Sequence, residues 1–292
     1  MLSPKPTGQS FGRKDRSDRA TSLDIADETQ MGEIKRVLIT AKTYPTPSKS
    51  YRETVCTGGV LEDGAFIRLY PINFRYRPEW ERFEKYQWIE VEVEKNPQDN
   101  RPETYKLVKG SKIITLDKIP PKNWAERRKY VLAKGTHDMC DLNSVDQKIC
   151  SMGIVNPRVV RDVKVEPVDP DWKNSVKERR KQLTLLEETK PLMKIPYKFS
   201  YVFECKAPGC KGHKMMDEDW EVGQLFRRML RKYKSEKKAC EKVRAKLLEH
   251  IDSAKRDIHF FVGTVYLHNT WVIVGTFCPP KGPREAQTEM NL

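Results

Sequence analysis

The chain has 292 residues, of which 33% are charged, and its net charge of +14 predicts an anionic partner such as nucleic acid. Its 38% of hydrophobic residues argue against disorder throughout. The lack of an apolar run of about 18 residues predicts no membrane span, and the lack of an apolar core at the N-terminus predicts no secretory signal. The seven scattered cysteines predict reduced thiols rather than a disulfide framework, so we expect a cytoplasmic protein.

The first part of the chain predicts a tail followed by a barrel. Residues 1–32 are rich in Ser, Gly, Pro and charge and have no apolar period, so we expect a disordered tail. From Ile34, five or six short β-rich segments follow, and Asp63-Gly64 predicts a hairpin turn between two of them. Such closely spaced strands predict a small antiparallel barrel over residues 33–120.

Residues 121–194 predict a helical linker region. Asn123 with Glu126 is typical of a helix start, and Gly135 suits the end of that helix. A second short helix is predicted over Ser144 to Met152, and a charged helix over residues 174–188.

Residues 195–281 predict one α+β unit, followed by a tail at 282–292. An aromatic-rich strand leads into a loop with two cysteines and a histidine. Apolar residues at 4-3 spacing then predict a basic helix of about 35 residues, and two final strands predict a β-hairpin. The predicted fold class of the chain is therefore α+β.

The segment from Lys35 to Arg75 carries a Cys, a Gly and an aromatic-Ile-Arg step. It resembles prokaryotic proteins with a dual OB-type domain, and the residues that carry the resemblance are Cys56, Gly58, Phe66, Ile67 and Arg68. The resemblance implies an oligonucleotide-binding barrel and nothing catalytic. The C-terminal signatures CKAPGCKGH and WVIVGTFCPPK resemble uncharacterised bacterial proteins linked to mobile elements or defence.

Cys205, Cys210 and His213 form the candidate metal site. Thiolate and imidazole ligands suit Zn²⁺, and the glycines between them allow a tight loop, so we predict a structural zinc. The candidates for a fourth ligand are Cys278, His259, His268 and Cys240. The alternative interpretation is a buried thiol pair, with His213 capping the following helix.

The predicted long helix carries an excess of positive charge between residues 225 and 246. This segment contains ten basic residues and only two acidic ones, Glu236 and Glu241. Like charges at this density favour a phosphate partner over a solvated face. The predicted contacts on this helix are Arg227, Arg228, Arg231, Lys234 and Lys238.

A second predicted contact surface lies on the barrel. Arginines alternate with aromatic residues there, which is how OB barrels hold single strands by gripping phosphates and stacking bases. The predicted residues are Arg68, Tyr70, Arg75, Tyr76 and Arg77, and the alternative is that the aromatic residues belong to the core with the arginines at its rim.

The sequence therefore predicts a largely sequence-nonspecific nucleic-acid-binding protein without a catalytic residue. The first alternative is a metal-dependent nuclease centred on His213, Asp219 and Glu221, although carboxylates at this place also suit a helix start. The second is an adaptor that docks an acidic protein partner. His137, Asp138 and Cys140 are too close in sequence to predict a catalytic Cys–His pair.

Overall fold

The structure is a computed structural model that describes residues 32–48, 51–174, 177–178, 190–266, 268 and 270–281. The described residues all belong to one compact unit that begins at Gly32. All of the predicted tail at 1–32 except Gly32, the predicted tail at 282–292 and most of the predicted helix at 174–188 lie outside the described residues.

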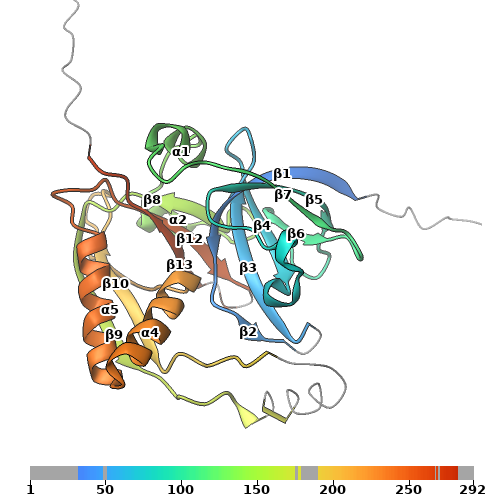
Figure 1. The fold of residues 1–292 in the computed structure, drawn as a ribbon. Helices are drawn as coiled ribbons and strands as arrows, with labels where there is room; N and C mark the ends of the chain where they lie inside the picture. Colours follow the sequence, from blue (N-terminus) through green and yellow to red (C-terminus); the bar gives the residue numbers. More distant parts are fainter. Residues whose placement is uncertain are drawn as a thin grey trace, which may run out of the picture. The chain divides into compact units, whose positions relative to one another are not determined.

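Five strands form a closed barrel in the first part of the chain (Figure 1). Their order around the ring is β1, β3, β4, β6, β5 and back to β1. Four of the five pairings are antiparallel, whereas β4 and β6 run parallel. A ring with an odd number of strands cannot alternate direction throughout, so one parallel pair is needed to close it. The strands are β1 (Glu33–Lys42), β3 (Glu53–Val60), β4 (Phe66–Ile72), β5 (Gln87–Lys95) and β6 (Thr104–Leu107).

Two further strands extend the barrel, β2 (Thr46–Pro47) beside β3 and β7 (Ile113–Lys118) beside β5. The period of two in β5 places Ile89, Val91 and Val93 inside, each at most 2% exposed. The predicted hairpin turn is also present, since Gly64 has φ +81° and donates its N–H to the Leu61 carbonyl. The predicted OB-like barrel and the α+β class are confirmed.

Two short 3₁₀ turns, η1 (Phe74–Tyr76) and η2 (Glu79–Glu81), lie between β4 and β5, and two helices, α1 (Trp124–Val131) and α2 (Met139–Ser144), follow the barrel. The predicted cap is present, because the Asn123 side chain accepts from the Glu126 N–H at 3.2 Å. The helix predicted from Ser144 to Met152 is wrong. Asp146 instead accepts from the Lys148 N–H at 2.8 Å, a local turn that competes with helix formation.

Two three-stranded antiparallel sheets make up the β structure of the second part. One has the order β11-β10-β9 and the other β13-β12-β8. The strands are β8 (Met152–Val155), β9 (Val159–Pro167), β10 (Tyr197–Glu204), β11 (His213–Met216), β12 (His259–Val265) and β13 (Thr270–Phe277). The predicted linker region thus supplies a strand to each sheet, and its boundaries at 121 and 194 stay a prediction.

The basic segment forms two helices, α4 (Trp220–Tyr233) and α5 (Glu236–His250), so the prediction of one continuous helix is wrong. Lys234 takes the left-handed conformation with φ +50°, which ends α4. Ser235 then accepts from the Lys238 N–H and caps α5. The apolar stripe is nonetheless buried as predicted, and includes Phe226 and Val243, both 0% exposed.

A short strap before α4 fixes the helix against the sheets. Asp217 bridges to Ile273 on β13, and Asp219 bridges to Thr43 at the end of β1. The Glu218 N–H also donates to the Ile273 carbonyl at 2.8 Å. Residues of the barrel and of both C-terminal sheets therefore meet where α4 begins.

Candidate functional site

Four potential metal ligands meet beside the first C-terminal sheet. The Sγ atoms of Cys140, Cys205 and Cys210 and a ring nitrogen of His213 all lie within 4.8 Å of one another. The separations are 3.5 Å from Cys140 to Cys205, 3.5 Å from Cys140 to His213 and 3.3 Å from Cys210 to His213. A tetrahedral zinc with bonds of about 2.3 Å to sulfur needs edges of roughly 3.8 Å, so the cluster could hold a metal ion.

Local structure explains why these four side chains converge. Cys205 follows the last residue of β10 and His213 opens β11, its pairing partner, so the loop must return on itself. Gly209 and Gly212 permit that turn with φ values of +71° and +92°. Cys140 lies on α2. Asp138, which precedes this helix, accepts from the Lys206 N–H at 2.7 Å and so connects the helix to the loop.

The fourth potential ligand is Cys140, which we did not predict from the sequence. Two of the predicted candidates have other surroundings: His259 lies 2.9 Å from an Asp257 oxygen, and Cys240 is on α5 with its side chain buried in the core. The alternative of a helix-capping His213 is wrong, because Asp219 caps α4. Burial lowers the pKa of His213, which favours the neutral imidazole that a metal requires.

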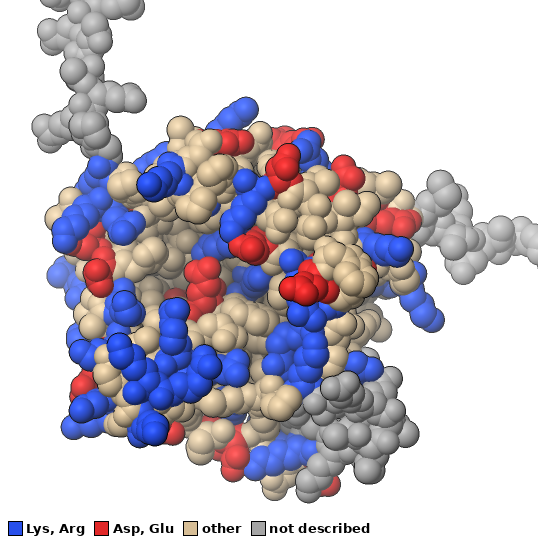
Figure 2. Space-filling model, viewed as in Figure 1, with Lys and Arg blue, Asp and Glu red and all other residues tan. Residues whose placement is uncertain are grey.

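Helices α4 and α5 carry a cationic surface, the α4–α5 face. Of the ten basic residues from 227 to 246, only Arg244 has an ion pair to another described residue, with Asp162. Figure 2 shows lysine and arginine side chains gathered over this part of the molecule with few carboxylates among them. The exposed members of the α4–α5 face are Arg228, Arg231, Lys232, Lys234, Lys237, Lys238, Lys242, Arg244 and Lys246.

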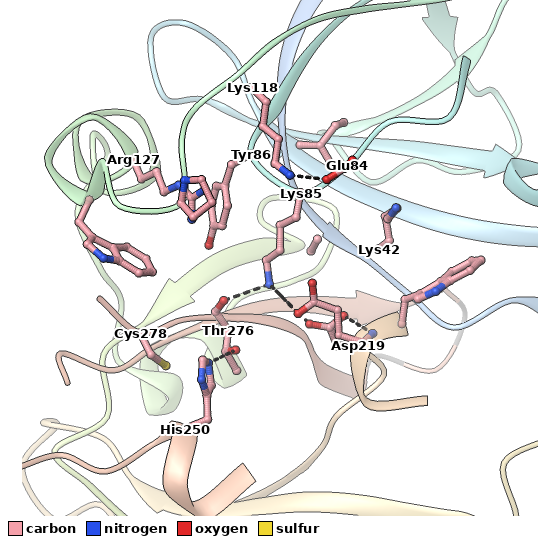
Figure 3. Close-up of a pocket in the computed structure, with 16 residues that line it drawn as sticks. Lys42, Glu84, Lys85, Tyr86, Lys118, Arg127, Asp219, His250, Thr276 and Cys278 are labelled. Carbon is pink, nitrogen blue, oxygen red and sulfur yellow. Dashed lines mark hydrogen bonds and ion pairs between the residues drawn. The ribbon is translucent and has the colours of Figure 1, made fainter. Parts of the chain in front are cut away.

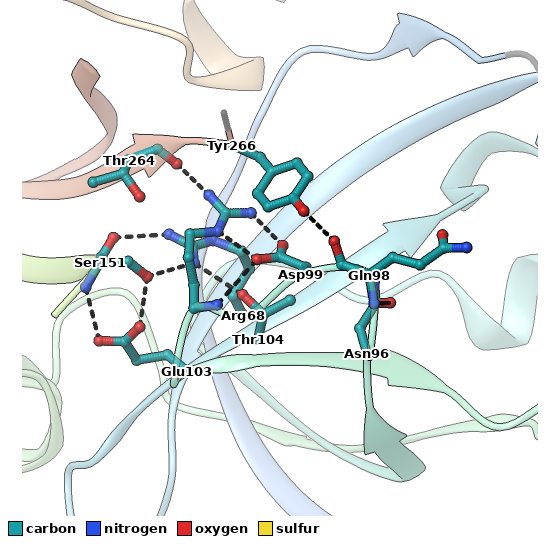
Figure 4. A network of polar contacts seen from close by, with 10 residues as sticks. Arg68, Asn96, Gln98, Asp99, Glu103, Thr104, Ser151, Thr264 and Tyr266 are labelled. Carbon is teal, nitrogen blue, oxygen red and sulfur yellow. Dashed lines mark hydrogen bonds and ion pairs between the residues drawn. The ribbon is translucent and has the colours of Figure 1, made fainter. Parts of the chain in front are cut away.

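The predicted barrel contact by Arg68 is wrong. Arg68 is 2% exposed, and its guanidinium donates to Thr104 and to Ser151 (Figure 4). Ser151 in turn donates to the Glu103 carboxylate. The network joins the barrel to the residues beside β8. Arg68 therefore has a structural role, although its spacing from Tyr70 on β4 predicted a contact with nucleic acid.

The next two arginines of the predicted barrel surface are also engaged within the protein. Arg75 makes a double hydrogen bond to the fully buried Glu53 carboxylate. Arg77 donates to Glu81 and to the Ser111 carbonyl, and its side chain is 20% exposed. Guanidinium groups held in this way stabilise the barrel. Tyr76 is also engaged within the protein, since its hydroxyl accepts from the Lys190 N–H.

Two adjoining cavities lie where α4 begins. The barrel-side cavity has a volume of about 410 Å³ and the helix-side cavity about 590 Å³. Their shared wall consists of Asp219, Trp220, Glu221, His250 and Thr276.

Three lysines and three carboxylates line the barrel-side cavity (Figure 3). Lys85 lies 3.6 Å from an Asp219 oxygen and donates to the Thr276 carbonyl at 3.1 Å. Burial opposes the charge of Lys85, but the combined effect of Asp219, Tyr86, Glu221 and Cys278 outweighs burial and raises the pKa of this lysine. Burial lowers the pKa of Lys42, on the same wall, to about 8.

Asp219 and Glu221 are part of this cavity wall and not of a centre with His213. Among the described residues, the only group of at least three potential ligands that could hold a metal is the Cys/His cluster, to which His213 belongs. The described residues therefore give no metal-ligand group that joins His213 to Asp219 and Glu221, and the nuclease alternative stays a prediction. Burial raises the pKa of Asp219 to about 6, and Asp219 accepts from the Glu221 N–H as the helix cap.

A family model described as a domain of unknown function, DUF8757, matches residues 134–292, more than half of the chain. The chain belongs to the DUF8757 family. A second model, described as the domain of unknown function DUF8758, matches residues 33–133 of this DUF8757 protein. The first match covers the Cys/His cluster and the α4–α5 face, and the second covers the barrel.

No curated protein matches the DUF8757 chain. Among solved structures, a murine DNA-binding protein bound with double-stranded DNA is similar at 9% identity and a TM-score of 0.30, with 88% of this chain and 100% of that chain covered. The tetrameric p202 HIN2 structure gives 10% identity and a TM-score of 0.28, with 86% and 95% covered. Likeness at this level leaves the function to be argued from the chain's own residues.

None of the helices in the part of the chain that the structure describes is long and apolar enough to cross a membrane.

Proposed function

We propose that the protein binds nucleic acid, largely without sequence preference, through the α4–α5 face. The supporting observation is that nine of the ten basic residues on this face have no carboxylate ion-pair partner among the described residues. Side chains that repel one another at such density gain from an external polyanion, because phosphates neutralise them and release bound counterions. Phosphate contacts carry no base information, so the binding is sequence-nonspecific.

The predicted contacts Arg227, Arg228, Arg231, Lys234 and Lys238 are kept in this proposal. Arg228, Arg231, Lys234 and Lys238 are exposed, and Arg227 is half-buried beside Gln224. Tyr70 and Tyr76 on the barrel stay predicted secondary contacts, whereas the arginines beside them are used within the protein.

A structural zinc held by Cys140, Cys205, Cys210 and His213 belongs to the same proposal. Three sulfurs and one imidazole form a complete ligand set for Zn²⁺, which leaves no open position for substrate. The ion would lock α2 to the β10–β11 loop. We also propose a cytoplasmic location, since seven thiols and a thiolate metal site suit a reducing compartment; a link to mobile elements or defence stays a prediction.

The test is fluorescence anisotropy of end-labelled DNA and RNA, single- and double-stranded, with wild type and the Lys238→Glu/Lys242→Glu variant. Each lysine is exposed on α5, and we expect the double reversal to weaken binding of every strand by roughly tenfold or more. Lys109→Glu/Lys112→Glu is the matched control, since both lysines are exposed in the β6–β7 turn of the barrel. Equal loss in both variants would show that only net charge matters and would contradict the proposal.

An acidic protein partner would also fit a cationic face, so a polyglutamate competitor is included. Nucleic-acid binding that survives an excess of this competitor supports the proposal, and complete displacement favours the adaptor. Incubation with Mg²⁺ or Mn²⁺ should leave the strands intact if binding is the activity.

A further inference from the structure

The helix-side cavity has a polar floor that nothing in the described part of the chain satisfies. Tyr201 and Asp217 both line this cavity. The Tyr201 hydroxyl and the Asp217 Oδ2 atom are buried without a hydrogen-bond partner among the described residues. Tyr201 is 1% exposed and Asp217 is 6% exposed. Buried polar groups are costly when unpaired, so two of them at one cavity point to a ligand that completes their hydrogen bonds.

The other Asp217 oxygen shows that this carboxyl is held in place. Oδ1 accepts from the Asp219 N–H at 2.9 Å, and the backbone of Asp217 is bridged to Ile273 on β13. Only Oδ2 is therefore left for a partner. A fixed carboxyl oxygen and a hydroxyl that line the same cavity are suited to N–H and amino donors of a ligand.

The walls and the rim have different chemistry. Val222, Leu225 and Leu247 give the walls apolar surface, and Trp220 adds an aromatic ring. Arg228, Arg231 and Lys246 line the same cavity, and all three are exposed members of the α4–α5 face. The volume of about 590 Å³ falls within the range of about 300–1,000 Å³ typical of small-molecule sites.

We propose that the helix-side cavity binds one nucleotide, with its phosphate at the Arg228–Arg231–Lys246 rim and the donor edge of its base toward Asp217 and Tyr201. A base is flat and apolar on its faces and carries N–H donors at its edge, which matches the walls and the floor. The nucleotide is either free or extruded from a bound strand; the second source rests on the function proposed above.

Free nucleotides are tested first by isothermal titration of the full chain with AMP, CMP, GMP and inorganic phosphate. The three nucleotides should bind at least about tenfold more tightly than phosphate, which can use only the rim. Asp217→Asn should reduce nucleotide affinity by about tenfold while Oδ1 is kept for the Asp219 N–H. Glu218→Gln is the matched control, because Glu218 neighbours Asp217 but does not line this cavity.

Tyr201→Phe is the second variant and guards against misfolding. It removes only a hydroxyl that has no partner among the described residues, so the melting temperature should stay the same or rise. Nucleotide affinity should nevertheless fall. Affinity that is unchanged in both the Asp217 and the Tyr201 variant would overturn the proposal.

The strand source is tested with a labelled strand that carries 2-aminopurine, whose fluorescence rises when the base leaves the stack. Anisotropy of the same strand reports binding separately. A rise that Asp217→Asn abolishes while anisotropy is retained shows extrusion into the cavity, and free-nucleotide binding without a rise assigns the cavity to free nucleotides.

The two proposals fail in different ways. One outcome is that strands bind, free nucleotides do not bind, and the 2-aminopurine fluorescence does not rise. This outcome would overturn the cavity site but not the proposed binding at the α4–α5 face. Nucleotides that bind while no strand does would support the cavity site and contradict the proposed function.

Discussion

At the scale of single residues, long-range neighbours decide what each side chain does. Cys140 becomes a potential ligand only because α2 lies against the β10–β11 loop, 65 residues further along the chain. The sequence predicted Cys205, Cys210 and His213, because those three share one loop. No local pattern marks Cys140, apart from its being an unassigned cysteine in a chain that needs a fourth ligand.

Removal of one ligand tests the metal site. Cys140→Ser should lose about one equivalent of bound zinc and several kcal/mol of the free energy of unfolding, because metal binding is coupled to folding. Metal analysis and urea denaturation measure the two effects. Cys56→Ser is the control, since Cys56 is outside the cluster, and zinc retained in full by Cys140→Ser would refute the assignment.

The buried pair of Arg101 and Asp99 gives a second residue-scale prediction. Both side chains are 4% exposed, and Arg101 also donates to the Thr264 carbonyl on β12. Arg101→Met leaves a buried carboxylate without its cation, so it should cost about 3–5 kcal/mol in urea denaturation. Lys118→Met breaks the exposed pair with Glu84 and should cost less than about 1 kcal/mol.

The buried Asp219 carboxyl predicts a pH dependence of stability. Burial raises its pKa to about 6 in the folded protein, above the value of about 3.9 in unfolded chains. The folded state therefore holds more protons between pH 4 and 6, and the contribution of Asp219 to stability falls as pH rises through this range.

Asp219→Asn removes this titration and keeps a good capping side chain. As pH rises from 4 to 6.5, the free energy of unfolding of the variant should increase relative to that of wild type by on the order of 2 kcal/mol. Parallel changes in wild type and variant would show that Asp219 does not titrate in this range.

At the scale of elements, periodicity predicted strands and caps well but missed one break. The apolar stripe continues across Lys234 and Ser235, so spacing alone indicated a single helix. Instead, Lys234 ends α4 with φ +50°, and Ser235 caps the start of α5. Glycine is the residue typical of a helix end in the left-handed conformation, so a lysine there does not mark the break in the sequence.

The break can be tested by a pair of glycine substitutions. Lys234→Gly should stabilise the protein by about 1 kcal/mol, because glycine takes the left-handed conformation without steric cost. Lys232→Gly, inside α4, should destabilise it by about 1 kcal/mol. Each variant removes one exposed lysine, so a difference between their melting temperatures reports the backbone and not the charge.

At the scale of the whole molecule, the sequence predicted the barrel, because its strands are adjacent and alternate clearly. It could not predict the two cavities at the start of α4, since these join residues from β1, the η2–β5 region, α5 and β13. It also placed arginines of the barrel on the nucleic-acid surface, whereas burial gives Arg68 a structural role. Charge composition predicts an anionic partner, and tertiary structure shows where the basic side chains gather.

The slope of log affinity against log salt concentration for duplex DNA tests the α4–α5 face most directly. Each phosphate contact contributes about 0.9 to the steepness of the slope. Neutralising Arg231, Lys237, Lys238 and Lys242 with glutamine should reduce the steepness by about 3–4 relative to wild type. A variant whose slope equals that of wild type would contradict the proposal that nucleic acid binds to this face.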